Sequence, residues 1–205
     1  MPVFPIDLPT KIGFSSFSVG IDNAVAVAMS EFTFEEQVQR HLGQAWEMTG
    51  TIELLDRDEA EIYNAFILKL GGREGTFTMG VAGSNQPRGN VSGSPVVDGE
   101  GQLGENLSVK GFTPSSNNVL RVGDYIQLGV GSSARLYKVL DDVNSDESGN
   151  ATLELAPRIV RAPTDEDTVI TSNAKGVFRL KTNLSLVDIK PPYIHKLSFS
   201  ARGVV

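Results

Sequence analysis

Side chains that could act as a general base, a nucleophile or a soft metal ligand are scarce in this sequence, which has two histidines and no cysteine. His41 and His195 each fall at or in a segment with the pattern of a strand, without a Glu or His partner at metal-ligand spacing. Serines are plentiful, but no G-x-S-x-G elbow frames any of them as a nucleophile. We therefore predict no catalytic, cofactor-binding or metal-binding residue, and we interpret the chain as a protein that is not an enzyme.

The best metal candidate is the segment 142–149, which places oxygen-bearing side chains at alternate positions like the start of a calcium loop. Glu147 stands at the sixth position, where such a loop needs glycine, and Leu153 stands at the twelfth, where it needs a bidentate glutamate. The glycine-rich segment 129–133 has neither a following helix start nor a Lys-Ser pair for a phosphate. We expect both segments to be turns between strands.

Two further signals have a structural and a functional interpretation. Arg121-Val-Gly-Asp124 favours a tight turn before a short strand. Trp46 lies on the apolar face of an alternating strand, which favours the core over a sugar-binding platform. Adjacent carboxylates such as Asp141 and Asp142 point opposite ways on a strand, and no feature selects any pair as the two acids of a glycosidase.

Composition narrows the class of partner. The chain of 205 residues has a net charge of −7, which argues against a surface that tracks nucleic-acid phosphates. No apolar run approaches the ~18 residues of a membrane span, and residues 1–9 do not have the pattern of a signal peptide. We expect synthesis in the cytosol, no membrane insertion and no specific nucleic-acid binding.

The clearest secondary-structure signals are one strand and one helix. Residues 46–54 alternate between apolar and polar side chains, with Trp46, Met48, Gly50, Ile52 and Leu54 on one face. Shorter strands are expected at 23–27 and 31–41. The period then becomes helical: Asp56 and Glu59 form a capping box, Gly71-Gly72 ends the helix, and its apolar stripe is Ile62, Tyr63, Phe66, Ile67 and Leu70.

The composition shifts to turn-forming residues between Gly80 and Gly104, which predicts a domain boundary or a long surface loop. Short strands follow at regular spacing, which is typical of a small barrel or sandwich: 107–110, 125–128, 134–139 and 152–155. The closing strands, at 177–181, 184–189 and from Tyr193, lack a core of their own. We therefore predict a mainly β protein in which a β-barrel domain of residues 81–175, OB-like in type, is inserted into a β-sandwich with one helix built from residues 1–80 and 176–205.

A resemblance to a known family covers most of residues 20–205. The stretch 41–79 resembles the amino-terminal domain of the distal tail proteins of long-tailed bacteriophages, and so does the closing Tyr-Ile-His-Lys-Leu-Ser-Phe-Ser at 193–200. Segments 120–128, 136–139 and 153–157 resemble the domain inserted in several members, in their Gly-Asp turn and strand order. The residues that carry the first likeness are Trp46, Phe66, Leu70, Gly71-Gly72 and Gly75-Thr76-Phe77.

The resemblance implies a homohexameric ring at the distal end of the tail tube, joined to the tail tube protein, the tail hub or tip and the tape-measure protein. It implies a location at the virion tail tip and no catalytic residues, and an acidic surface would suit a channel for DNA. Three alternatives remain open: another tail component such as a tube, adaptor or baseplate subunit; a module in which 81–175 binds host surface glycans, or a cell-wall enzyme; and a generic β-protein. Few aromatic residues are available for glycans: Phe112, Tyr125 and Tyr137.

Overall fold

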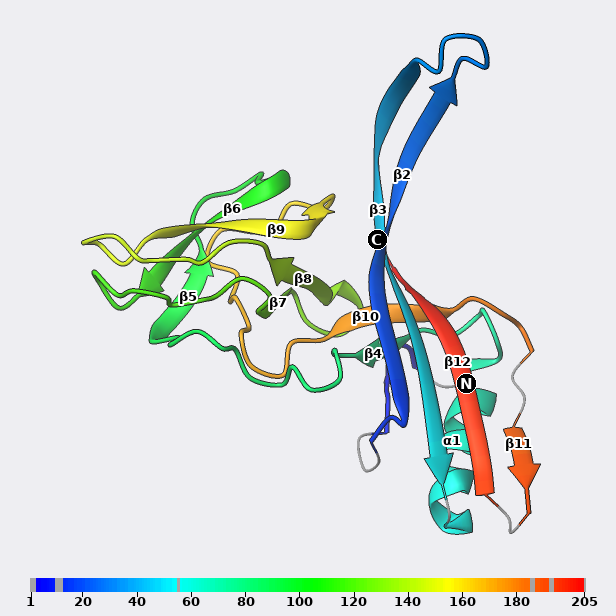
Figure 1. Ribbon diagram of the computed structural model, residues 1–205. Coiled ribbons are helices and arrows are strands. Elements are labelled where there is room, and N and C mark those ends of the chain that lie inside the picture. The colour runs from blue at the N-terminus through cyan, green and yellow to red at the C-terminus, as the bar shows by residue number, and fades with distance from the viewer. Residues whose placement is uncertain (1–2, 10–12, 55, 185–186, 192–193, 205) are drawn as a thin grey trace.

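The computed structural model describes residues 3–9, 13–54, 56–184, 187–191 and 194–204. It is mainly β, with two sheets and one α-helix in the described part, as the sequence predicts (Figure 1). The first sheet comprises β1 (Ile6–Asp7), β2 (Ser16–Met29), β3 (Glu36–Leu54), β4 (Phe77–Met79), β10 (Gly176–Leu180), β11 (Val187–Lys190) and β12 (Ile194–Gly203). The second comprises β5 (Gly93–Val97), β6 (Gly104–Phe112), β7 (Tyr125–Leu128), β8 (Arg135–Val139) and β9 (Ala151–Ile159).

The first sheet joins the two ends of the described chain. Its strand order is β1-β4-β10-β12-β3-β2. β10 pairs with the last part of β12, and β11 pairs with the first part. β12 pairs with β3 from His195 opposite Leu54 to Arg202 opposite Glu47. The segment between β4 and β10 contributes no strand to this sheet and holds all five strands of the second. Tyr193, which the sequence places on the last strand, lies outside the described residues.

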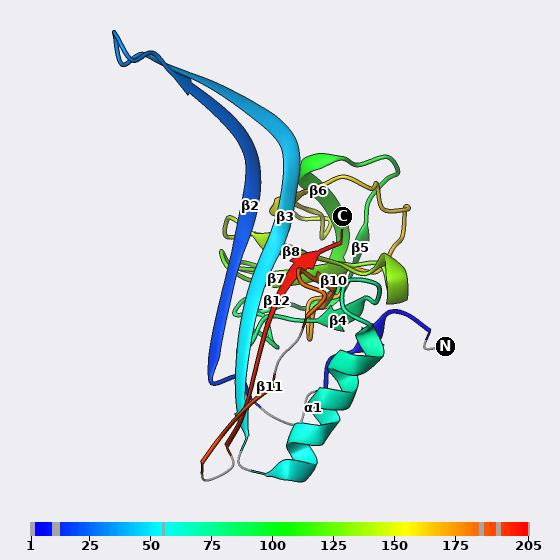
Figure 2. The ribbon, with the colours of Figure 1, turned by 90° about the vertical axis from the view of Figure 1, so that its right-hand side faces the viewer.

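Helix α1 (Arg57–Leu70) covers one face of the first sheet, beside the lower halves of β3 and β12 (Figure 2). Asp56 caps it by accepting a hydrogen bond from the Asp58 amide at 2.9 Å, and Gly71 ends it in the left-handed conformation. Phe77 centres the core beneath the helix, edge-on to Phe66 and with its ring centroid 5.6 Å away. No helix of the described residues is long and apolar enough to cross a membrane.

The second sheet curls into a half-barrel because one segment bridges both of its edge strands. Val96 of β5 bridges to Thr168, and Gln127 of β7 bridges to Ile170. The sheet order is β5-β6-β9-β8-β7, and its interior is apolar. The fully buried side chains of this second core include Leu107, Leu120, Ile126, Leu153 and Leu155.

The two sheets meet at Trp46. This residue is 5 % exposed, and its indole Nε1 donates a hydrogen bond to the Leu136 carbonyl of β8 at 2.8 Å. Tyr125 and Leu136 also pack into the first core, so the half-barrel shares apolar contacts with the sheet that flanks it. The core interpretation of Trp46 is confirmed, and the residue also fixes one domain against the other.

Four local predictions need correction. The sequence gives a strand from Glu31, but residues 31–35 form the turn between β2 and β3. Both of these strands are much longer than expected, and β3 runs without a break through residues 41–46. Ile62 was expected in the buried stripe of the helix but is 47 % exposed, while Ala60 is buried in its place. The region 80–104, expected to be a domain boundary or a long loop, contains β5, whose Gly93 and Pro95 are unusual within a strand.

Candidate interaction surfaces

Residues 24–42, the distal part of the β2–β3 hairpin, form an arm that projects beyond both sheets (Figures 1 and 2). β12 pairs with β3 only as far as Glu47, so the arm has two strands and no further sheet partner. Every residue of the arm is exposed except Ser30, which is partly buried. A two-stranded hairpin is at best marginally stable alone in water, so an arm of this length indicates a surface that binds another molecule.

One face of the arm is mainly apolar and also carries Glu36 and Arg40. Residues paired across a hairpin share a face, and the register sets Val25 opposite Arg40 and Val27 opposite Val38. Met29 and Leu42 continue the same face, whereas Ala26, Ala28, Gln37 and Gln39 fall on the other by alternation. The exposed fractions on the apolar face are 46 % for Val25, 59 % for Val27, 55 % for Met29, 64 % for Val38 and 67 % for Leu42.

The tip of the arm presents two phenylalanines among carboxylates. Phe32 is 95 % exposed and Phe34 is 73 % exposed, and Glu31, Glu35 and Glu36 flank them. The turn is ordered by hydrogen bonds: the Phe34 amide donates to the Ser30 carbonyl, and the Ser30 amide donates to the Glu35 carbonyl, each at 2.9 Å. Phe34 has φ of 57°, a strained value for a bulky residue, and such strain gathers at binding sites.

A groove lies at the base of the arm, between the two sheets. Its main hollow has a volume of about 670 Å³, and a smaller, deeper hollow beside it shares five of its lining residues: Gln44, Ala45, Arg158, Val160 and Gly203. The walls carry exposed apolar side chains, Leu42 at 67 %, Leu103 at 60 % and Val160 at 50 %. The groove thus combines apolar walls with the size of a small ligand pocket.

Arginines give the groove a positive charge. The smaller hollow is lined by Arg135, Arg158 and Arg161 and by no carboxylate of the described residues. The Nε of Arg135 is buried without a hydrogen-bond partner, and burial lowers the pKa of this guanidinium. No carboxylate in the described part of the chain pairs with Arg135 or Arg158. The main hollow has one carboxylate, Asp22, which pairs with Arg202.

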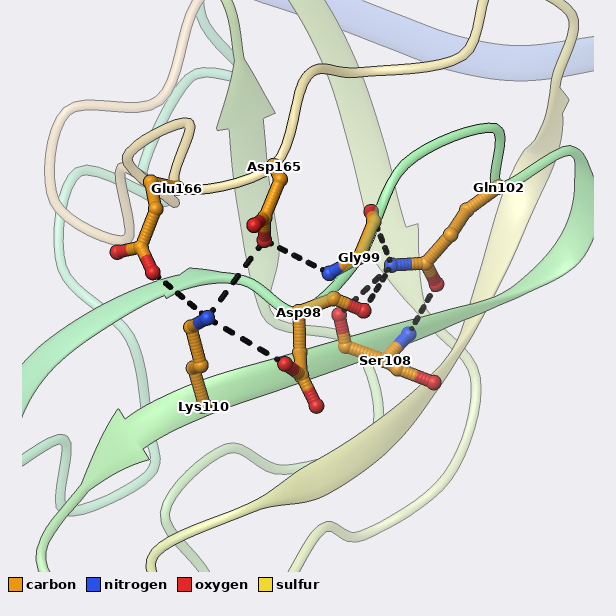
Figure 3. Close-up of polar contacts among 7 residues, drawn as sticks. All are labelled: Asp98, Gly99, Gln102, Ser108, Lys110, Asp165 and Glu166. Carbon is orange, nitrogen blue, oxygen red and sulfur yellow. Dashed lines mark hydrogen bonds and ion pairs between the residues drawn. The ribbon is translucent and has the colours of Figure 1, made fainter.

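A polar cluster on the second sheet surrounds Lys110 with three carboxylates (Figure 3). Its Nζ lies 2.6 Å from Glu166, 3.4 Å from Asp98 and 3.6 Å from Asp165, and the bond to Glu166 raises the pKa of Lys110. Asp165 also accepts from the Gly99 amide at 2.8 Å, which lowers the pKa of that carboxyl. The cluster ties β6 and the turn after β5 to the segment that closes the half-barrel, so we interpret it as a structural clasp.

The calcium-like segment uses its oxygens on the chain's own amides. Asp146 accepts from the Ser148 and Asn150 amides, both at 2.8 Å, which lowers the pKa of its carboxyl. Asp142 accepts from the Val122 amide at 2.9 Å and Asn144 from the Asn118 amide at 2.7 Å, so three of the candidate ligands point to different backbone sites. The described residues contain no group of three or more His, Asp or Glu side chains that could hold a metal ion.

The Gly-Asp turn has a larger structural role than its sequence indicates. Asp124 is 3 % exposed and accepts hydrogen bonds from the amides of Arg88, Gly89 and Arg121, at 2.7, 3.0 and 2.8 Å. The carboxylate therefore fixes its own turn and also the loop that leads into the second sheet. The turn interpretation is confirmed, and the long-range contacts to the loop add to it.

Histidines and aromatics do not gather into a site. His41 lies on the exposed arm, and His195 lies opposite Leu54 on the first sheet. The three aromatic side chains considered for glycan binding are buried, with Phe112 3 %, Tyr125 7 % and Tyr137 5 % exposed. They fill the cores, so none of the three offers a platform to a sugar.

The sheet face away from α1 is polar, and charged side chains on it pair across the strands. Lys196 pairs with Glu53 at 3.1 Å, and Arg202 pairs with Asp22 and Glu47 at 2.5 and 3.1 Å. Hydroxyls of β3 and β12 add cross-strand contacts, such as Thr51 with Ser198 at 3.1 Å.

Comparison with known proteins adds no relative. No protein-family model matches the sequence, and no curated protein matches it.

Proposed function

We propose that this chain is a structural subunit of a bacteriophage virion that forms a ring at the distal end of the tail tube. It works by geometry rather than catalysis, and its partners are further copies of itself, the tail tube protein, and the tail hub and tape-measure proteins. The mainly β fold, with one helix and a second sheet inserted before the closing strands, is the architecture that the family resemblance implies. In this proposal the chain is made in the host cytoplasm and resides at the tail tip.

The observation that carries the proposal is the open edge of β2. This strand of 14 residues ends the first sheet and pairs only with β3, so its outer backbone groups meet no strand of the described chain. Proteins protect exposed edges with lysine, proline, β-bulges or short strands; β2 has no lysine or proline and is long, and its one irregularity is the register shift between Asn23 and Val25. A long edge with so little protection favours a subunit whose edge is covered in an assembly, as cyclic oligomers do at their heterologous contacts.

Immunogold electron microscopy with an antibody against this chain tests the proposal. The sample is phage particles from the source or an induced lysate. We expect label clustered at the tail tip. Label along the tube would instead favour a tube subunit, and label on a baseplate wall would favour an adaptor or baseplate part. Virions without label, alongside bound protein elsewhere in the lysate, would contradict the proposal.

A further inference from the structure

We propose that the arm tip of one copy docks into the arginine-lined groove of a second copy. The tip consists of residues 31–36, and the groove consists of the two adjoining hollows at the base of the arm. The inference rests on the proposed function only for the idea that the copies close into a ring. The contact itself is argued from the shape, charge and exposure of the two surfaces.

The two surfaces are complementary in charge and polarity. The tip has three glutamates and no cation, and it exposes Phe32 almost completely. The groove exposes Leu103 and Val160 and holds Arg135 and Arg158, for which the described chain supplies no carboxylate. Arginine with an apolar wall suits a partner that carries an aromatic ring beside a carboxylate, because the guanidinium can pair with the acid and also stack on the ring.

The Arg135 guanidinium is only partly satisfied within the described chain: its Nη1 donates to the Ser132 and Ala134 carbonyls, each at 3.0 Å, and its Nε has no hydrogen-bond partner. A carboxylate docked in the groove would meet this guanidinium and that of Arg158, and charge-assisted hydrogen bonds to a carboxylate are among the stronger ones. The tip offers such acceptors on both sides of its aromatic pair. A lipid surface is a poorer occupant for the tip, because glutamates at the insertion point are repelled by the anionic headgroups of a cytoplasmic leaflet.

The tip reaches a groove only in another copy. Strands rise about 3.3 Å per residue, so the five steps from Ala24 to Met29 cover roughly 17 Å, and the turn carries the tip further from the groove at its own base. That reach suits a neighbouring subunit. Tip and groove are different surfaces, so the contact is head-to-tail, and repeated copies close into a ring when the rotation permits. The apolar face of the arm between tip and base would then lie along the neighbour.

The absence of cysteine from the chain allows a direct test by engineered disulfide. We would combine Thr33→Cys at the tip with Val160→Cys in the groove and oxidise the full-length protein. Within one copy these sites are far beyond the ~7 Å Cα separation that a disulfide spans, so any bond formed joins two copies. We expect covalent multimers from the double variant and from an equal mixture of the two single variants.

The matched control replaces Val160→Cys with Val122→Cys, a valine of similar exposure, 47 % against 50 %, that does not line the groove. Cross-linking as strong with Val122→Cys as with Val160→Cys would overturn the proposal. So would tip-to-tip dimers of Thr33→Cys alone as the main product, because they would indicate a symmetric pairing of arms.

Noncovalent assembly gives the second test, by analytical ultracentrifugation. We expect Phe32→Ser or Arg158→Glu to weaken self-association by about 30-fold or more, as loss of an interface anchor does. A mixture of the two variants retains one intact tip and one intact groove, so it should form dimers and nothing larger. Unchanged assembly of both variants, or a wild-type chain that stays monomeric, would refute the docking.

These outcomes separate the docking from the proposed function. Label at the tail tip together with unchanged assembly of the tip and groove variants would leave the virion role standing and reject the contact. Specific cross-linking of tip to groove without label on any virion would establish the contact and reject the phage role.

Discussion

The two halves of β3 differ in their surroundings and in how strictly apolar residues alternate along them. In the lower half, 46–54, Trp46, Met48 and Ile52 enter the first core, and Ile52 is fully buried. In the upper half, 36–45, polar Glu36, Arg40 and Gln44 share a face with Val38 and Leu42, and Val38 is 64 % exposed. Lower β3 has β12 beside it and a helix over it, whereas upper β3 has only β2. The strand pattern therefore fixes which side chains share a face, and the neighbouring elements decide whether that face is buried within one copy.

The largest expected effect compares Ile52→Ala with Val38→Ala. Removal of a fully buried isoleucine side chain leaves a cavity and should lower the free energy of unfolding by about 2–5 kcal/mol. Val38 is already exposed, so its substitution removes little buried surface and should change the free energy of unfolding by no more than ~0.5 kcal/mol. Urea unfolding of dilute, monomeric protein would measure both. A large loss at Val38 would show that the arm is already packed under those conditions.

Trp46 stands where the two halves of β3 meet, and Trp46→Phe should have the next largest effect. The substitution keeps an aromatic side chain but leaves the Leu136 carbonyl without its donor, which costs about 1–3 kcal/mol at a buried site. Thermal unfolding followed by circular dichroism would measure the loss, since this variant removes the single tryptophan. In the wild-type chain, fluorescence of that tryptophan reports on the junction, and a signal insensitive to unfolding would contradict the buried contact.

Sequence reasoning predicts the parts of this fold that are set by local signals. The capping Asp56, the helical period and Gly71 locate α1 closely, and strict alternation locates lower β3. The arm is less clear from the sequence: Val38 and Leu42 alone do not distinguish an exposed strand from a buried one, although Glu36, Arg40 and Gln44 on the same face favour exposure. Whether a third strand covers this part of β3 depends on where β12 ends.

The groove was missed for a related reason. Arg135 and Arg158 belong to no motif; they lie on β8 and β9, which pair in the second sheet, and residues of the first sheet supply the other wall of the hollow. The open edge of β2 likewise depends on sheet order, which the sequence does not encode in any short window. A strand of 14 residues without lysine or proline is the signal that indicates an edge for another molecule to cover.

A smaller effect is expected from the ion pair that links the arm to the second sheet, Arg40 with Glu105. Both side chains are substantially exposed, 60 % and 40 %, so Arg40→Met should cost only about 0.2–1 kcal/mol, and less at high salt. Amide hydrogen exchange would show the change as faster exchange in the arm and none in lower β3. Equal acceleration in both halves would mean that the arm and the body unfold as one unit.

The smallest expected effect is a change of slope with pH at the clasp, where polar contacts hold an exposed segment that has little apolar burial. The Gly99 amide lowers the pKa of Asp165 in the folded chain. The unfolded state therefore binds more protons in acid, so the stabilisation is present above the ordinary aspartate pKa near 3.8 and is lost as pH falls through the lower folded value. Asp165→Asn should make stability fall less steeply below about pH 5, as measured by urea midpoints across that range.

Arg40→Met is the control, because it changes no hydrogen-bonded carboxyl of the clasp, and its acid slope should match that of the wild type. An Asp165→Asn slope equal to the wild-type slope would mean that the clasp adds no stability. The segment that closes the half-barrel would then be held by its strand bridges alone.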